Sequence, residues 1–304
     1  MTFLKKQQLK RIGYILEYTM TATIFFIIKH LSFKSKSFAS FVIGRFAIYP
    51  YLRFIEKKRF NIFKNNINIV SNKIFSNKEH LHLFKKYCTY ITKVFFTTTH
   101  QNQFTKQWLE NNVKEENFEQ MLQAHKNGEK IIITSAHFGN WEIAQHYLTK
   151  VKNLPLTVMY REQNNIRVSK LLYNNRKDIQ LIEKRNKSSL KQMLQSLNSG
   201  RIVIVLLDQK DSLNGSPIQF FGKTTMLPTA IARIAIKNQC KVFTCKCTAE
   251  HLTISCENAI ESENFSDETI LTQAIFKTFE KWISANPTNW YCLTHNIWNY
   301  HFTK

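Results

Sequence analysis

The hydrophobic pattern changes character part-way along the chain. Through residues 1–125, apolar and aromatic side chains recur at mixed helical spacings, as in FASFVIGRFAIYPYLRFIEKKRF at 38–60. Such spacing predicts helices, one of which Pro50 kinks or ends. From about residue 126 onward, short β-branched runs alternate with amphipathic segments, so this part predicts strands and helices in turn.

The second part predicts strands at KIIITSA, PLTVMY, RIVIVLLD, KVFTCKC and HLTISC, and helices from residue 141, over 188–200, over 228–237 and over 267–285. RIVIVLLD is apolar throughout, as in strands that are covered on both faces. We therefore expect an α/β fold: a mixed, largely parallel central sheet flanked by helices, with a helical membrane-associating N-terminal region. In such a sheet, functional groups gather at the carboxyl ends of the strands.

An apolar stretch at 12–28 is interrupted by Glu17 and has basic residues on both sides. It is shorter than the ~20 residues that span a bilayer, and no small-residue cleavage site follows it, so a removable signal peptide is not expected. We expect a helix that lies in the membrane interface, with the rest of the chain on the cytoplasmic side. A true span and a buried core helix remain open alternatives.

The pattern predicts three regions. Residues 1–55 form the membrane-associating helices, residues 56–125 a helical region that packs on the following domain, and residues 126–304 an α/β domain, in which the candidate chemistry described below lies. No low-complexity linker separates them.

The strongest compositional signal is the net charge of +22, from 43 Lys and Arg against 21 Asp and Glu. It indicates an anionic partner: nucleic acid, an anionic membrane surface, a phosphorylated lipid or an acidic protein. Four of the six cysteines lie between Cys240 and Cys256, but their spacing matches no zinc pattern. We interpret them as core thiols in a reducing compartment and expect no metal site.

Several catalytic motifs can be excluded. FGKTT at 221–225 resembles the end of a phosphate-binding P-loop, but Pro217 stands where the first glycine is required. The seven glycines form neither a G-x-G-x-x-G fingerprint nor a G-x-S-x-G serine elbow.

The candidate chemistry follows the strand run, where IIITSAHFGNWEIA at 131–144 contains His137 and Glu142. If the strand ends near Ser135 and a helix begins at Trp141, Gly139 forms the turn and Asn140 the N-cap. Glu142 would then lie in the first helical turn and hydrogen-bond the His137 imidazole, leaving its other nitrogen free as a base. Since no protein nucleophile accompanies them, the pair suits activation of a substrate hydroxyl. A satisfied loop histidine remains the alternative.

AHFGNWE after a strand resembles the H-x4-D/E signature of the lipid A biosynthesis late acyltransferases, the lauroyl and myristoyl transferases. Glycerophosphate acyltransferases share this motif type. The resemblance covers residues 115–300 and includes YREQNN at 160–165, LLDQK at 206–210 and NPTNWYCLTHNIW at 286–298.

The resemblance implies transfer of a fatty acyl chain from an acyl carrier protein thioester to a hydroxyl of a lipid A precursor in lipopolysaccharide biosynthesis. His137 would be the general base, with Glu142 holding it. Arg176, Asp208 and Arg161 would bind substrate or support the transition state, and Gly139, Asn140 and Trp141 would shape the motif. For Asp208, a pairing with Arg or Lys at the strand end remains open.

The implied partners are acyl carrier protein, a phosphorylated glycolipid acceptor and the membrane surface. The implied location is the inner membrane, with the catalytic domain on its cytoplasmic face. The thioester is a co-substrate, and no cofactor is expected.

Two alternatives remain. One is an acyltransferase for another lipid hydroxyl, on a glycerophospholipid or a glycosylated inositol lipid. The more remote one is a basic nucleic-acid-binding protein, for which we find no RNP, helix-turn-helix or zinc signature. We therefore expect no nucleic-acid partner.

Overall fold

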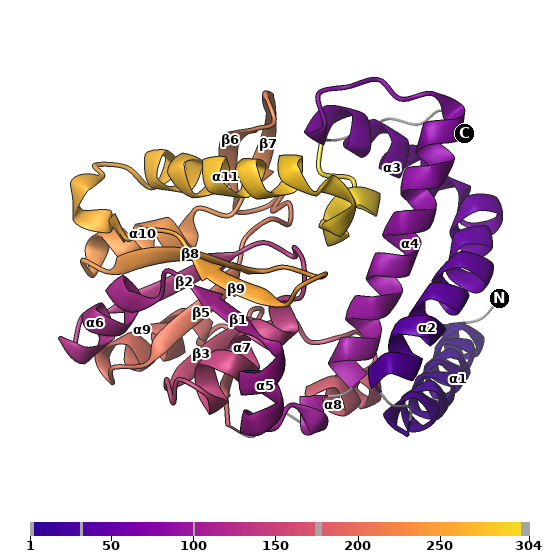
Figure 1. The fold of residues 1–304 in the computed structure, drawn as a ribbon, viewed down its shortest axis with the longest axis horizontal. Helices are drawn as coiled ribbons and strands as arrows, with labels where there is room; N and C mark the ends of the chain where they lie inside the picture. The colour runs from indigo at the N-terminus through magenta and orange to yellow at the C-terminus, as the bar shows by residue number, and fades with distance from the viewer. Residues whose placement is uncertain (1–2, 31–32, 100, 174–177, 299–304) are drawn as a thin grey trace.

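The computed structural model describes residues 3–30, 33–99, 101–173 and 178–298 (Figure 1). Its centre is a sheet with the strand order β1-β9-β8-β2-β5-β3-β4, in which β10 also pairs with β8. The strands are β1 (Lys114–Glu116), β2 (Ile131–Ser135), β3 (Leu156–Tyr160), β4 (Gln180–Glu183), β5 (Ile202–Leu206), β8 (Lys241–Cys247), β9 (Thr253–Cys256) and β10 (Ile260–Glu261).

The central strands β8, β2, β5, β3 and β4 are parallel to one another, whereas β9 and β10 are antiparallel to β8. This confirms the predicted α/β class with a mixed, mostly parallel sheet. β2 is buried along its whole length, which explains its run of three isoleucines, and its last two residues, Thr134 and Ser135, are small polar residues that hydrogen-bond to carbonyl groups of β8. Ile132 packs in one core layer, while Ile131 and Ile133 pack in the other.

Helices cover both faces of the sheet. The layer that contains Ile132 receives side chains from α9 (Ser189–Asn198), α10 (Ala230–Lys237) and α11 (Glu268–Ala285). The opposite layer receives them from α5 (Lys106–Asn112), α6 (Glu119–Lys126) and α7 (Trp141–Lys150). In α11, the Asp267 side chain caps the N-terminus by accepting from the amides of Thr269 and Ile270.

Several elements differ from the sequence predictions. β1 lies in the part expected to be helical; its three exposed charged residues carry no apolar pattern, and pairing with β9 at the sheet edge makes them a strand. No strand was predicted between RIVIVLLD and the helix over 228–237, but a hairpin lies there, β6 (Ser216–Phe220) and β7 (Lys223–Leu227), which stands beside α11 in Figure 1. Ile218 and Phe220 point from it into the core. β4, β10 and α8 (Ile166–Tyr173) were not predicted either.

The N-terminal region gathers at one end of the molecule (Figure 1). It consists of α1 (Phe3–Lys29), α2 (Phe33–Ile43), two π-helical turns η1 (Gly44–Ile48) and η2 (Tyr51–Ile55), α3 (Lys57–Val70) and α4 (Asn77–Thr99). Pro50 lies between the two wide turns, as expected of a residue that lacks the N–H of a helical hydrogen bond.

Two N-terminal segments, Arg11–Ile28 and Ser35–Ile55, are long and apolar enough to cross a membrane by length and composition. Only 11% of each is buried, so within the described chain they are not core helices. Glu17 interrupts the first segment because it faces the catalytic part: Asn165 donates to its carboxylate at 3.0 Å and to the Tyr14 carbonyl at 2.8 Å. Asn165 precedes α8 (Ile166–Tyr173), against which α1 packs. The boundaries at 55/56 and 125/126 stay predictions.

Candidate active site

His137 and Asp208 lie side by side at the carboxyl edge of the sheet. β2 and β5 are parallel neighbours in which Ser135 pairs with Leu206, so the residues two positions beyond each strand meet. His137 Nδ1 is 2.7 Å from Asp208 Oδ1, and the His137 backbone N–H donates to Asp208 Oδ2 at 2.9 Å. With Nδ1 protonated towards the carboxylate, Nε2 is the unprotonated nitrogen and can accept a proton.

Asp208 is fully buried, and its second oxygen also accepts the indole N–H of Trp290 at 2.7 Å. Burial works to raise the pKa of Asp208, but the charge of His137 and the N–H donors of His137 and Trp290 outweigh it and lower this pKa below its ordinary value. The Cys292 thiol also donates a hydrogen bond to Asp208. Burial and the negative charge of Asp208 raise the pKa of this thiol well above its ordinary value. Asp208 is therefore an ionised, fixed partner for the imidazole.

Backbone contacts fix the turn that presents His137. Gly139 has a φ of +62°, and a Cβ there would lie 1.9 Å from the Cys247 carbonyl oxygen, so only glycine fits. The Asn140 N–H donates to that same oxygen at 2.7 Å, and the Tyr291 N–H donates to the His137 carbonyl at 2.8 Å. The end of β8 and the C-terminal segment thus clamp the turn from both sides.

The helix after the turn begins at Trp141, as predicted, and Asn140 occupies its N-cap position. The side chain of Asn140 does not cap the helix, however. Its Nδ2 donates to Thr97 Oγ1 on α4 at 3.2 Å, so it ties the turn to the N-terminal helices instead.

The predicted hydrogen bond between Glu142 and His137 is not formed in the described structure. The Glu142 carboxylate is buried and accepts amide N–H groups from Gln101 at 2.9 Å and Gln145 at 2.7 Å. The first turn of α7 directs it towards Gln101 in η3 (Gln101–Gln103), whereas the end of β2 directs His137 towards β5. The carboxylate that contacts the His137 imidazole is Asp208, and this contact favours the functional role of Asp208 over the open alternative of a pairing with Arg or Lys.

Aromatic rings surround the imidazole. The Trp141 ring meets the His137 ring edge-on with centroids 5.2 Å apart, and the Tyr291 ring lies 6.1 Å away on another side. Trp141 and Tyr291 also contact each other, at 5.9 Å. These rings restrict the orientations that His137 can adopt.

His137 and Glu142 both line a cavity of about 1300 Å³. One part of its wall is apolar, between the sheet and α7; its residues are Ile133, Ala144, Leu148, Val158, Ile204 and Ile254. Another part carries the basic side chains of Arg161, Lys184, Arg185 and Lys210. The N-terminal helices contribute Ile24, Ile43 and Phe95. The cavity therefore joins an apolar slot, a basic wall and the imidazole.

The predicted site residues fall into three groups. Four of them line the catalytic cavity: His137, Trp141, Glu142 and Arg161. Asp208 contacts Nδ1 of His137. Gly139 and Asn140 shape the turn. Arg176 lies outside the described residues, so its role stays a prediction.

Sequence reasoning did not assign roles to Trp290, Tyr291 or Gln101. The first two lie in NPTNWYCLTHNIW, which was noted as a motif, but nothing local shows that this segment returns to the end of β5. Gln101 carries no sequence signal at all.

His137, Asp208 and Cys292 offer ligand atoms within 4.8 Å of one another. Oδ2 of Asp208 accepts two N–H donors, and Oδ1 lies at hydrogen-bond distance from Nδ1 of His137. The arrangement fits a hydrogen-bonded acid–base pair better than a metal centre.

The model of the bacterial lipid A biosynthesis acyltransferase family matches residues 5–299. The chain belongs to this family. It is also similar to phosphatidylinositol mannoside acyltransferases: 21% identical over 184 residues to that of Mycobacterium tuberculosis, covering 53% of this chain and 52% of that protein, and 25% identical over 183 residues to that of Mycolicibacterium smegmatis, covering 55% and 56%. The chain thus spans about half the length of these curated relatives.

Proposed function

We propose that the protein transfers a fatty acyl chain from an acyl carrier protein thioester to a hydroxyl of a phosphorylated glycolipid, a lipid A precursor. The observation that carries this proposal is the imidazole of His137, held by Asp208 at the wall of a large cavity with an apolar slot and a basic side. The family membership supports the same reaction class.

In the proposed reaction, Nε2 of His137 takes the proton of the acceptor hydroxyl, and the oxygen attacks the thioester carbonyl. A C–O bond forms as the carbonyl becomes a tetrahedral oxyanion. When the oxyanion collapses, the C–S bond breaks and the leaving sulfur takes the proton back from His137. Asp208 stabilises the imidazolium that exists between the two proton transfers, as the buried carboxylate does in serine hydrolases.

Glu142 acts in this proposal through its charge. Its carboxylate lines the same cavity as His137 and is fixed by two amide donors. A negative charge in that wall favours the positive charge that develops on His137. Arg161, with the neighbouring lysines, would hold acceptor phosphate groups, since guanidinium and ammonium groups both bind phosphate. Arg176 would support the substrate or the oxyanion.

The apolar slot would receive the acyl chain, because its aliphatic walls lie between the sheet and α7. The exposed apolar N-terminal helices would seat the protein on the cytoplasmic face of the inner membrane, where the acceptor lies. The net charge of +22 would attract the acidic carrier protein and the anionic lipid surface.

A second acceptor, a mannosylated inositol lipid, is favoured by the names of the two relatives. The test is incubation of purified protein with defined acyl carrier protein thioesters and, separately, a lipid A precursor and a phosphatidylinositol mannoside, followed by mass analysis of the products. Acylation of the lipid A precursor is the expected result. Acylation of the inositol lipid alone would favour the second acceptor, and no product from either would contradict the proposal.

A further inference from the structure

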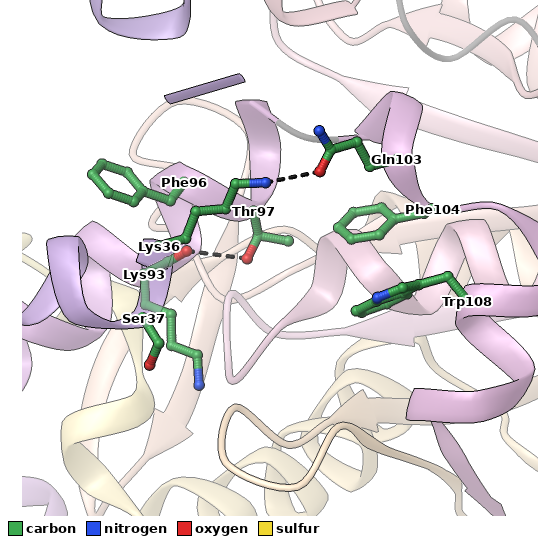
Figure 2. Close-up of a pocket in the computed structure, with 8 residues that line it drawn as sticks. All are labelled: Lys36, Ser37, Lys93, Phe96, Thr97, Gln103, Phe104 and Trp108. Atoms are coloured by element: carbon green, nitrogen blue, oxygen red, sulfur yellow. Dashed lines mark hydrogen bonds between the residues drawn. The ribbon is translucent and has the colours of Figure 1, made fainter. Parts of the chain in front are cut away.

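A second, smaller cavity of about 70 Å³ lies where two of the N-terminal helices meet the segment that follows them (Figure 2). Its walls come from α2, from the C-terminal half of α4 and from the segment of η3 and α5. Phe96 lines both this cavity and the catalytic one, so its ring stands between them.

Lys36 brings a charge into this wall. Only 6% of the residue is exposed, and its Nζ donates to the neutral amide oxygen of Gln103 at 2.8 Å (Figure 2). No ion pair of Lys36 occurs among the described residues. Burial of this ammonium lowers the pKa of Lys36 to about 8. A buried cation with a neutral partner is stabilised by any anion that reaches it.

The rest of the lining is mainly aromatic. The rings of Phe104 and Trp108 lie one beside the other, with centroids 5.1 Å apart, and Figure 2 shows them across from Lys36. Phe96 adds a third ring. A second ammonium, that of Lys93, belongs to the same lining and donates to the Ala249 carbonyl at 2.9 Å. The lining of this cavity therefore combines two ammonium groups with three aromatic rings.

We propose that this cavity binds an amphipathic anion, the carboxylate or phosphate end of a lipid, with Lys36 as its counter-charge and Phe104 and Trp108 along its first methylene groups. The aromatic wall disfavours a purely hydrophilic anion, which would lose hydration without compensation. The buried ammonium disfavours a neutral lipid for the same reason. The cavity holds only the end of such a molecule, and the chain would leave it towards the apolar N-terminal helices.

The cavity is connected to the catalytic turn. Thr97 lines it, and the hydroxyl of Thr97 accepts the Asn140 side-chain N–H at 3.2 Å. The short segment that carries Gln103 also carries Gln101, which holds Glu142. A lipid bound at Lys36 thus contacts two elements that position the catalytic residues. The binding site itself does not depend on which acyl transfer the protein performs.

The test uses the full chain in a non-ionic detergent and a fatty carboxylate brominated on its chain, which quenches nearby tryptophan emission. We expect saturable quenching of Trp108, measured as the difference between the wild type and Trp108→Phe, because a chain in the catalytic cavity would quench Trp141 in both proteins. Lys36→Met keeps the side-chain length but removes the charge, and should weaken the binding about 10-fold or more. The matched control is Lys106→Met, an exposed lysine on the same α5 as Trp108, which should leave the binding unchanged.

A brominated alcohol of equal chain length should fail to quench saturably, and inorganic phosphate should fail to displace the carboxylate. A long-chain alkyl phosphate should displace it, and its affinity relative to the carboxylate tells which headgroup the site prefers. The affinity should fall as the pH rises past about 8, where Lys36 loses its proton, and Lys36→Met should remove this dependence. Lys93, whose pKa burial also lowers, is the other titratable group of the wall.

Equal quenching of wild type and Lys36→Met would overturn the proposal. So would equal binding of the alcohol, or displacement by inorganic phosphate, which would indicate a site for soluble anions. These binding measurements need no acceptor or thioester, so their failure is distinguishable from a failure of the proposed acyl transfer.

Discussion

At the scale of single residues, the structure gives the imidazole of His137 a different carboxylate partner from the one that the motif spacing favours: Asp208 instead of Glu142. Asp208 is fully buried and lies at hydrogen-bond distance from the His137 imidazole. Glu142 has no such contact with His137, but it lines the same catalytic cavity. A base needs a partner that fixes its tautomer, and only a hydrogen-bonded group can do so. We therefore propose that Asp208 fixes the tautomer of His137 and that Glu142 contributes charge.

Removing the base should abolish turnover. In His137→Ala no group accepts the hydroxyl proton, so we expect a loss of about 10³-fold or more in kcat, with an unchanged melting temperature. The assay is acyl transfer from a carrier-protein thioester, with circular dichroism as the fold control. Near-normal turnover of purified His137→Ala would contradict the assignment.

Asp208→Asn keeps the shape but replaces one acceptor oxygen with an NH2 donor and removes the charge. The imidazole would then lose its fixed tautomer, and we expect kcat to fall by about 10³–10⁴-fold. Glu142→Gln removes the charge but leaves an amide oxygen that can still accept from Gln101 and Gln145, and we expect a fall of about 10²-fold. The comparison contradicts our assignment if Asp208→Asn retains more activity than Glu142→Gln.

Trp290 should act on the pH profile. Its indole N–H helps to lower the pKa of Asp208, so Trp290→Phe should raise that pKa. Asp208 supports the base only when it is ionised, that is, at a pH above its pKa. If the pKa of Asp208 rises, the acid limb of the pH profile of kcat therefore moves to higher pH. The matched control is Trp298→Phe, which removes an indole of the same aromatic cluster whose N–H bonds the Phe220 carbonyl instead. Identical profiles for both variants would refute the role.

At the scale of elements, the β2–α7 turn depends on one close approach. Gly139 and Gly128 both have positive φ, but only at Gly139 would a Cβ collide, with the Cys247 carbonyl. Gly128→Ala should therefore cost only about 1 kcal/mol of unfolding free energy from backbone strain. Gly139→Ala should cost several times more, measured by chemical denaturation. Equal losses would show that the contact with β8 does not constrain the turn.

The elements also show what sequence could predict. β2 was recognised by its β-branched run and β5 by its continuous apolar run, and His137 was placed correctly just beyond β2. Asp208 was identified as a functional residue, but its partner His137 was not. The two residues meet because Ser135 pairs with Leu206 in the sheet, and sequence alone does not show which strands are neighbours. Local spacing favoured Glu142, five residues away in sequence. The helix start at Trp141 is local and was predicted, whereas the direction of the Glu142 side chain depends on η3.

At the scale of the whole molecule, charge and apolar surface act together. The net charge is +22, and the N-terminal region exposes large apolar side chains, among them Phe38 at 71% and Phe46 at 69%. Basic residues near an anionic bilayer contribute about 1 kcal/mol each, and salt screens this attraction. Apolar insertion is not screened. The two contributions can therefore be separated by salt.

We expect the protein to float with vesicles that contain anionic lipid at low salt and to be partly released at about 1 M salt, where the Debye length falls to about 3 Å. The double variant Phe38→Ser, Phe46→Ser should lose the salt-resistant fraction, because it removes exposed apolar area from α2 and η1. Ile270→Ser on α11 is the matched control, since Ile270 is 55% exposed but lies outside the N-terminal region. If the control loses as much binding as the double variant, the membrane-facing surface is not the N-terminal one. If salt alone releases all of the protein, then charge suffices and the apolar helices do not insert.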